Sequence, residues 1–308
     1  MSLASRATTA SRTTVAPALA RSYARSLLRR SAERAVDLPR TRYVQHGVRA
    51  DVDRLAAFCR ETGTPLRDRL PLPFGHLLGF GLQVDLLVSE PFPFRLLGLV
   101  HVHQRFAQRR ALLLEDGLAG AAGFDVAVRA TGMRPHRRGA LVDVVTEVRG
   151  PGDDPLGPAS WEGRSRYLAR GVRVPGAPAR EDDPLPRPER GAVAQWRVDA
   201  GTGRRWAALS GDVNPIHLAA PAARLFGFRR AIAHGLWTAS RSLAALDPLP
   251  ERVRADVEFA APLLLPATVE HVVARDGGGW STVVRGRPRE DRPARVHLVA
   301  RVEELPVP

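Results

Sequence analysis

Apolar and polar positions alternate along several short stretches of the chain, as they do in strands that are buried on one face. In the C-terminal half the alternation covers residues 253–260 and 294–302. Between them, Asp276-Gly277-Gly278-Gly279 stands before a further apolar run and predicts the turn of a hairpin. In the N-terminal half, similar stretches predict strands at residues 99–106, 123–130, 139–148 and 161–171.

A weak internal repeat relates the two halves. Residues 55–63 (LAAFCRETG) align with residues 206–214 (WAALSGDVN) at an offset of 151 positions. Farther on, GHLLGF around His76 corresponds to HGLWTA around His234, where residues 236–246 have the apolar spacing of a buried central helix. Both halves are therefore expected to share one fold, with strands packed on a central helix.

The two copies differ at the positions of Asp212 and His217. In the register of the repeat, Glu61 and Leu66 stand at these two positions. The first copy is also seven residues shorter between its aligned stretches. Because a leucine cannot transfer a proton, we expect the N-terminal copy to keep the fold without the chemistry.

The stretch SGDVNPIH, residues 210–217, carries the clearest chemical signal. Asn214 followed by Pro215 predicts a helix start, because Asn is a strong N-cap and Pro at the first helical position loses no hydrogen bond. His217 then lies in the first turn, where the helix dipole disfavours a charged imidazole and favours an ionised Asp212. An ionised carboxylate beside a neutral imidazole can take a proton from water. Taken singly, each of these residues is better explained as a turn former or a buried histidine. Taken together with Gly235, they favour the catalytic interpretation.

Two segments together resemble the MaoC-like dehydratases and (R)-specific enoyl-CoA hydratases, which are hotdog-fold proteins. The resemblance implies an α+β double hotdog fold, in which two antiparallel sheets each wrap around a central helix and the N-terminal copy is degenerate. The matching residues keep the family's order over about 30 positions. They are Ala207, Ser210, Gly211, Asp212, Asn214, Pro215, His217, Gly227, Phe228, Ile232, Ala233, His234 and Gly235.

The resemblance also implies roles for these residues. Asp212 is the expected general base, and His217 the partner that positions or protonates. The backbone N–H of Gly235 is expected to polarise the thioester carbonyl, as an oxyanion donor does. Other motif residues are expected to support the loops, with His234 as a structural hydrogen-bonding residue: Ser210, Gly211, Asn214 and His234.

Three further residues are candidates for substrate binding. Arg229 and Arg230 lie shortly before the His234-Gly235 turn and could bind the phosphates of coenzyme A, since a guanidinium binds phosphate in a bidentate manner. A pair of solvated surface arginines is the alternative interpretation. Trp237, just after the turn, is the third candidate.

Charge changes this picture little. The formal net charge is +14, and all 46 basic residues counted are arginine. They are dispersed, without zinc-finger spacing or an RNA-binding aromatic signature, so we expect no nucleic-acid partner.

One cysteine, Cys59, excludes an internal disulfide and predicts a core or helix-face thiol. His101 and His103 share a strand face without a third ligand nearby, so we expect no metal and no redox cofactor.

The expected organisation has four parts. Residues 1–37 form a partly disordered, arginine-rich extension, which could also be a mitochondrial transit peptide. Residues 38–173 form the degenerate hotdog, 174–190 a proline-rich linker, and 191–308 the catalytic hotdog. No apolar run approaches the length of a membrane span. We expect a cytoplasmic protein, either a monomer that resembles a dimer or a homodimer.

The leading function is reversible hydration of an enoyl thioester carried by coenzyme A or an acyl carrier protein. An acyl-CoA thioesterase and a non-catalytic acyl-thioester-binding protein are the alternatives. The complete set of Asp212, Asn214, His217 and Gly235 favours the hydratase.

Overall fold

The computed structural model describes residues 8–9, 37–178, 184–288 and 293–306, so most of the predicted N-terminal extension and part of the linker lie outside the described residues. The chain divides into two compact units. Of the described residues, the first unit takes those up to Asp51, Asp68–Gln104 and those from Arg110 to the linker. The second takes Val52–Arg67, Arg105–Arg109 and those that follow the linker.

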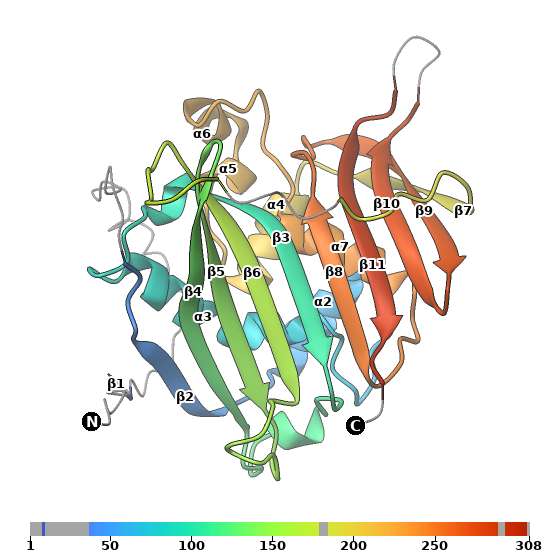
Figure 1. The fold of residues 1–308 in the computed structure, drawn as a ribbon. Helices are drawn as coiled ribbons and strands as arrows, with labels where there is room; N and C mark the ends of the chain where they lie inside the picture. Colours follow the sequence, from blue (N-terminus) through green and yellow to red (C-terminus); the bar gives the residue numbers. More distant parts are fainter. Residues whose placement is uncertain (1–7, 10–36, 179–183, 289–292, 307–308) are drawn as a thin grey trace. The chain divides into compact units, whose positions relative to one another are not determined.

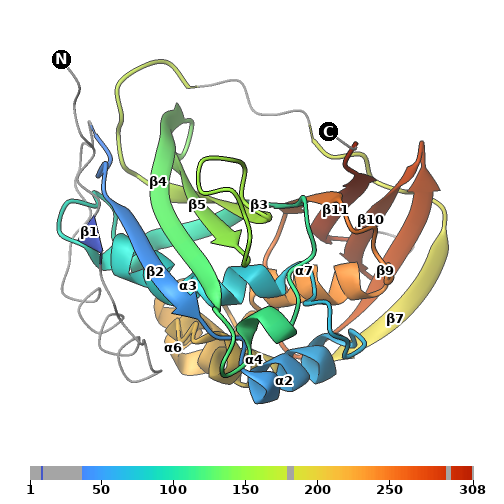
Figure 2. The ribbon, with the colours of Figure 1, turned by 90° about the horizontal axis from the view of Figure 1, so that it is seen from below.

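The sheet of the first unit has the strand order β1-β2-β4-β5-β6-β3. The pairs β2–β4, β4–β5 and β5–β6 are antiparallel, and the short pair β1–β2 is parallel. A long helix, α3 (Phe74–Val88), packs on β2, β4, β5 and β6, and two views show it against the sheet (Figures 1 and 2). The strands and short 3-10 turns are β1 (Thr8–Thr9), β2 (Arg42–Val48), η1 (Leu96–Gly98), β3 (Leu99–Gln108), η2 (Glu115–Gly117), β4 (Phe124–His136), β5 (Gly139–Arg149) and β6 (Trp161–Arg170).

Close packing of α3 on its sheet depends on glycine. A Cβ at Gly75 would lie 2.6 Å from the ring of Trp161, and one at Gly79 would lie 2.5 Å from Thr146. Both distances are shorter than real Cβ contacts, so the helix can approach the strands this closely only without side chains there. Trp161 is fully buried and donates its indole N–H to the Leu72 carbonyl at 2.8 Å.

The second unit has an antiparallel sheet in the order β8-β11-β10-β9-β7. Its central helix, α7 (Gly235–Ala244), packs against β11, and the inner face of the sheet buries Val272, Val283 and Val299. The other elements are α2 (Val52–Thr62), β7 (Ala192–Val198), α4 (Thr202–Ser210), α5 (Pro215–Leu218), α6 (Ala220–Leu225), β8 (Val253–Phe259), β9 (Ala267–Asp276), β10 (Gly279–Gly286) and β11 (Val296–Glu304).

The strands expected from alternation are present, and so is the hairpin. β9 and β10 pair across Gly277 and Gly278, which have φ values of 53° and 91°. Such positive φ values favour glycine and explain the glycine run. The pattern missed β2, none of whose residues is buried, and the edge strand β7, where only Trp196 and Val198 are buried among the described side chains.

The division into units does not follow the order of the chain. The helix α2 belongs to the second unit, although its residues precede most of the first. It packs on α4 (Figure 2). The ring centroids of Phe58 and Trp206 lie 5.6 Å apart. Cys59 is buried in this helix, as expected of a core thiol, and burial raises its pKa to about 11. Within the described residues, no helix is long and apolar enough to cross a bilayer.

Candidate active site

The loop of the SGDVNPIH motif begins where α4 ends. Gly211 caps the helix in the left-handed conformation, with φ 82°, and its N–H bonds to the Ala207 carbonyl at 2.9 Å. This helix ending is common with glycine, because a side chain would strain the positive φ. The next residue, Asp212, donates its N–H to Ser210 Oγ at 3.1 Å. The backbone of Asp212 is therefore held at the fixed end of α4.

Asn214 starts the short helix α5, as the sequence predicted. Its side chain accepts a hydrogen bond from the Ile216 N–H at 3.4 Å, and Pro215 occupies the first turn. Its own N–H bonds to Asp212 Oδ1 at 3.2 Å, so one carboxylate oxygen is used in shaping the loop. His217 follows within this single turn, with its N–H on the Asn214 carbonyl at 3.0 Å.

His217 is buried and held in one tautomer. Its Nδ1 lies 2.9 Å from the carbonyl oxygen of Ile232. A carbonyl oxygen can only accept, so Nδ1 carries the hydrogen, and in the neutral ring Nε2 has a free lone pair. Burial lowers the pKa of His217, against the opposing effects of Asp212 and the Ile232 carbonyl. The imidazole is therefore a neutral hydrogen-bond acceptor at neutral pH.

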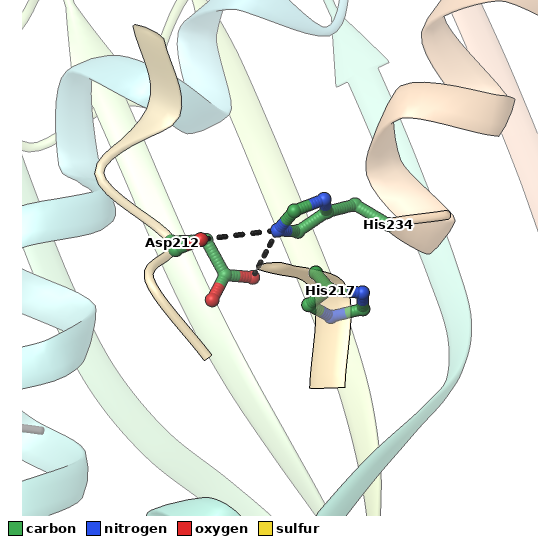
Figure 3. A group of neighbouring side chains, drawn as sticks. All are labelled: Asp212, His217 and His234. Carbon is green, nitrogen blue, oxygen red and sulfur yellow. Dashed lines mark hydrogen bonds and ion pairs between the residues drawn. The ribbon is translucent and has the colours of Figure 1, made fainter. Parts of the chain in front are cut away.

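His234 connects the loop to the start of α7. Its Nε2 donates to the main-chain carbonyl of Asp212 at 3.0 Å and lies 3.7 Å from Asp212 Oδ2 (Figure 3). Its ring also stacks on that of His217, with centroids 3.6 Å apart. Burial and the neighbouring His217 lower the pKa of His234 to about 3, although Asp212 opposes the shift. Its Nδ1 is buried without a hydrogen-bond partner among the described residues.

Asp212, His217 and His234 form one cluster. A carboxylate oxygen and one nitrogen from each ring all lie within 4.8 Å of one another. The Asp212 side chain is 26% exposed, whereas that of His234 is 2% exposed, so the carboxylate is the more accessible group. Such a set can hold a water molecule and remove its proton. The same spacing would also suit a metal ion.

Gly235 begins α7 directly after His234. The first amides of a helix have no acceptor within it and point toward its positive end, where they can bind an anionic oxygen. Residues 231–240 are buried except for Gly235, which is partly exposed. A Cβ at this position would lie 3.0 Å from the Phe259 ring, so tight packing also explains the glycine.

The three predicted substrate contacts differ in their exposure. Arg229 and Arg230 are exposed, and Arg230 Nη1 donates to the Pro266 carbonyl at 3.2 Å. Trp237 is buried, and its indole N–H donates to the main-chain carbonyl of Glu61 at 3.2 Å. The tryptophan therefore joins α7 to α2.

The residues at the equivalent positions of the first copy make no such pair. Glu61 accepts a hydrogen bond from Arg205 Nε at 2.5 Å, and Leu66 is 56% exposed. Two contributions to the site had no signal in the sequence: the Ile232 carbonyl that orients His217, and the contacts of α2 with the motif-bearing helix α4. Both join residues far apart in the chain.

Comparisons with known proteins identify related sequences. A family model described as "MaoC like domain" matches residues 186–287. The 3-hydroxyacyl-thioester dehydratase X of Mycobacterium tuberculosis is 35% identical over 260 residues, which cover 83% of this chain and 86% of that protein.

Solved structures show the same fold. A crystal structure of HtdX from M. tuberculosis has 32% identity and a TM-score of 0.70, and the match covers 86% of this chain and 100% of that one. A MaoC-like dehydratase from Phytophthora capsici has a TM-score of 0.63 at 18% identity, with 86% and 95% covered. The expected α+β double hotdog is therefore confirmed.

Proposed function

This chain belongs to the MaoC-like dehydratase family, and from that premise we propose that it catalyses the reversible hydration of trans-2-enoyl thioesters. The reverse reaction is the dehydration of (R)-3-hydroxyacyl thioesters. The proposal rests on one observation. A carboxylate oxygen of Asp212 and one nitrogen from each of two buried, neutral imidazoles, His217 and His234, lie within 4.8 Å of one another. The resemblance to a 3-hydroxyacyl-thioester dehydratase over 83% of the chain supports the same reaction.

In the proposed mechanism, Asp212 and His217 hold one water between two acceptors. The second oxygen of Asp212, Oδ2, accepts a hydrogen bond from one hydrogen of the water, since Oδ1 accepts the Asn214 N–H. His217 Nε2 accepts a hydrogen bond from the other hydrogen, because the Nδ1–H of the same ring is bonded to the Ile232 carbonyl. With both hydrogens directed at acceptors, the lone pairs of the water oxygen face the substrate.

The chemical step adds one water and changes no oxidation state overall. The water oxygen bonds to C3 while Asp212 takes one of its protons, and the electron pair of the double bond moves onto the thioester carbonyl. The resulting enolate collapses as C2 receives the proton that the water lost, delivered from within the Asp212–His217 pair. Removal of C2–H and loss of the C3 hydroxyl as water is the same sequence in reverse.

We propose that the Gly235 N–H stabilises the enolate oxygen. Its place at the positive end of α7 and its partial exposure within a buried run support this role. A preorganised donor of this kind contributes about 3 to 4 kcal/mol to the transition state. We assign no redox cofactor to this step, because the addition is redox-neutral.

The acyl carrier is coenzyme A or an acyl carrier protein. Arg229 and Arg230 are the proposed phosphate contacts, since both are exposed. We further expect the enzyme to act in the cytoplasm as a monomer or a homodimer.

The test is hydration of trans-2-enoyl-CoAs of increasing chain length by the purified protein, followed by absorbance of the conjugated thioester. Loss of that band, with a 3-hydroxyacyl-CoA as the product, is the expected result. Release of free thiol without a hydroxyacyl product would instead identify a thioesterase. Tight binding of an enoyl-CoA with no reaction at any chain length would identify a binding protein.

A further inference from the structure

The helix α2 lies beside α4, at whose end the catalytic loop begins (Figure 2). The two helices share a buried contact between Phe58 and Trp206. Arg54 stands one turn before Phe58 on α2 and is partly buried. The position of its guanidinium is therefore set by a packed helix, which the sequence places in the degenerate copy.

Arg54 bonds to the last carbonyls of α4. Its Nε donates to the Leu209 carbonyl at 2.6 Å, and its Nη2 donates to the Ser210 carbonyl at 3.3 Å. The final carbonyls of a helix have no partners within it, and they form the negative end of its dipole. One guanidinium thus supplies both hydrogen bonds and positive charge at the point where the chain leaves the helix.

From that point, short-range hydrogen bonds lead to the reacting groups. Ser210 Oγ accepts the Asp212 N–H, and Asp212 Oδ1 accepts the Asn214 N–H. Asn214 in turn accepts the N–H groups of Ile216 and His217. A shift of Ser210 would therefore move the carboxylate relative to the imidazole.

The repeat places Arg54 and Arg205 at equivalent positions. Each arginine bonds across to the helix that carries the other. Arg205 on α4 bonds to Glu61 in the last turn of α2, while Arg54 on α2 bonds to the end of α4. Glu61 is the residue that the repeat aligns with Asp212. Each arginine thus bonds to the C-terminal end of the other helix, where a loop begins. Only the loop after α4 carries the acid/base residues.

We propose that Arg54 is a positioning residue for Asp212, through which the degenerate copy supports catalysis in the other. The expected change in kcat rests on the proposed function, whereas the expected change in the loop of residues 211–217 does not. Loss of the guanidinium should lower kcat much more than it changes KM, since it touches the loop and not the substrate. A displacement of the order of 1 Å costs about 100-fold in rate when it misaligns reacting groups.

The experiment compares Arg54→Met with Arg60→Met in the full-length protein. Arg60 is an exposed residue of the same helix, so its replacement removes the same charge without the carbonyl contacts. We measure kcat and KM with crotonyl-CoA, together with amide hydrogen exchange of residues 211–217. Arg54→Met should lower kcat about 10- to 100-fold with KM within about threefold of wild type. It should also speed exchange in the loop, and Arg60→Met should do neither.

A kcat for Arg54→Met within twofold of that for Arg60→Met would overturn the inference, as would unchanged exchange of the loop. If the wild-type protein hydrates no enoyl-CoA, the proposed function fails, and loop exchange alone then decides the role of Arg54. Should Arg54→Met not fold, Arg54→Gln replaces it under the same criteria, because its shorter amide cannot reach both carbonyls.

Discussion

The imidazoles of His217 and His234 stack with their centroids 3.6 Å apart and 25° between the ring planes. Two charged rings this close would repel each other, and burial further disfavours their charge. The pKa values of both are accordingly lowered, that of His234 to about 3. At neutral pH the stack therefore carries no charge.

Replacing His217 with Ala should remove one of the two acceptors that hold the water. We expect kcat to fall by about 100- to 10,000-fold, the range typical for a general acid/base group, with KM little changed. The Ile232 carbonyl loses its partner as well, so the midpoint of thermal unfolding should also decrease. Steady-state hydration kinetics and a thermal melt measure the two effects. Hydration at the wild-type rate would exclude His217 from the mechanism.

Replacing His234 with Phe keeps an aromatic ring beside His217 but removes the N–H that bonds to the Asp212 carbonyl. We expect kcat to drop by about 10-fold or more, because the loop can then shift relative to His217. The buried carbonyl without its donor should cost about 1 to 3 kcal/mol in the free energy of unfolding. Denaturant titration gives the second quantity. Loss of stability with full activity would limit His234 to a structural role.

Stability should decrease in acid, in part because of His271. This buried ring bonds to Ser242 Oγ at 2.9 Å, and burial, with Arg241 nearby, lowers its pKa to about 4. An unfolded histidine has a pKa near 6.5, so between about pH 6.5 and 4 the unfolded chain binds a proton that the folded one does not. The free energy of unfolding therefore falls as pH falls through this window, by at most about 1.4 kcal/mol per pH unit from this group.

The variant His271→Gln tests this assignment, since glutamine does not titrate. Its free energy of unfolding, measured by urea titration at several pH values, should depend less steeply on pH between 6.5 and 4 than that of wild type. Equal slopes in the two proteins would show that His271 is protonated in the folded state as readily as in the unfolded one.

Removal of metal ions should leave activity unchanged. Although the spacing of Asp212, His217 and His234 would suit a metal ion, the His234 nitrogen nearest the carboxylate carries a hydrogen that it donates to a carbonyl. A protonated nitrogen cannot serve as a ligand. Dialysis against EDTA should therefore change kcat by less than about twofold, whereas loss of activity that is restored by added metal would contradict the proposed mechanism.

Local features of the site could be predicted from the sequence, because they depend on neighbouring residues. The helix start at Asn214-Pro215 and the hairpin at Gly277-Gly278 both follow from backbone preferences that act over a few positions. The motif likewise brought out Asp212 and His217 as a pair, and the structure places them together.

Long-range contacts could not be predicted. Trp237 stands next to the His234-Gly235 turn, which made it a candidate for substrate binding, but the helix directs its indole to the Glu61 carbonyl. The partners of Arg54 lie 155 and 156 positions away, so no pattern in the sequence pairs them. The tautomer of His217 depends on the Ile232 carbonyl, which is a backbone group without a residue-type signal.

The hydration of crotonyl-CoA by wild type and Asp212→Asn, measured side by side, tests the central claim most directly. Asparagine can still accept the Asn214 N–H that shapes the loop, so the fold should persist while the base is lost. We predict that the wild-type protein removes the enoyl-thioester absorbance and that the variant does so about 100- to 10,000-fold more slowly. Equal rates in the two proteins would contradict the assignment of Asp212 as the general base.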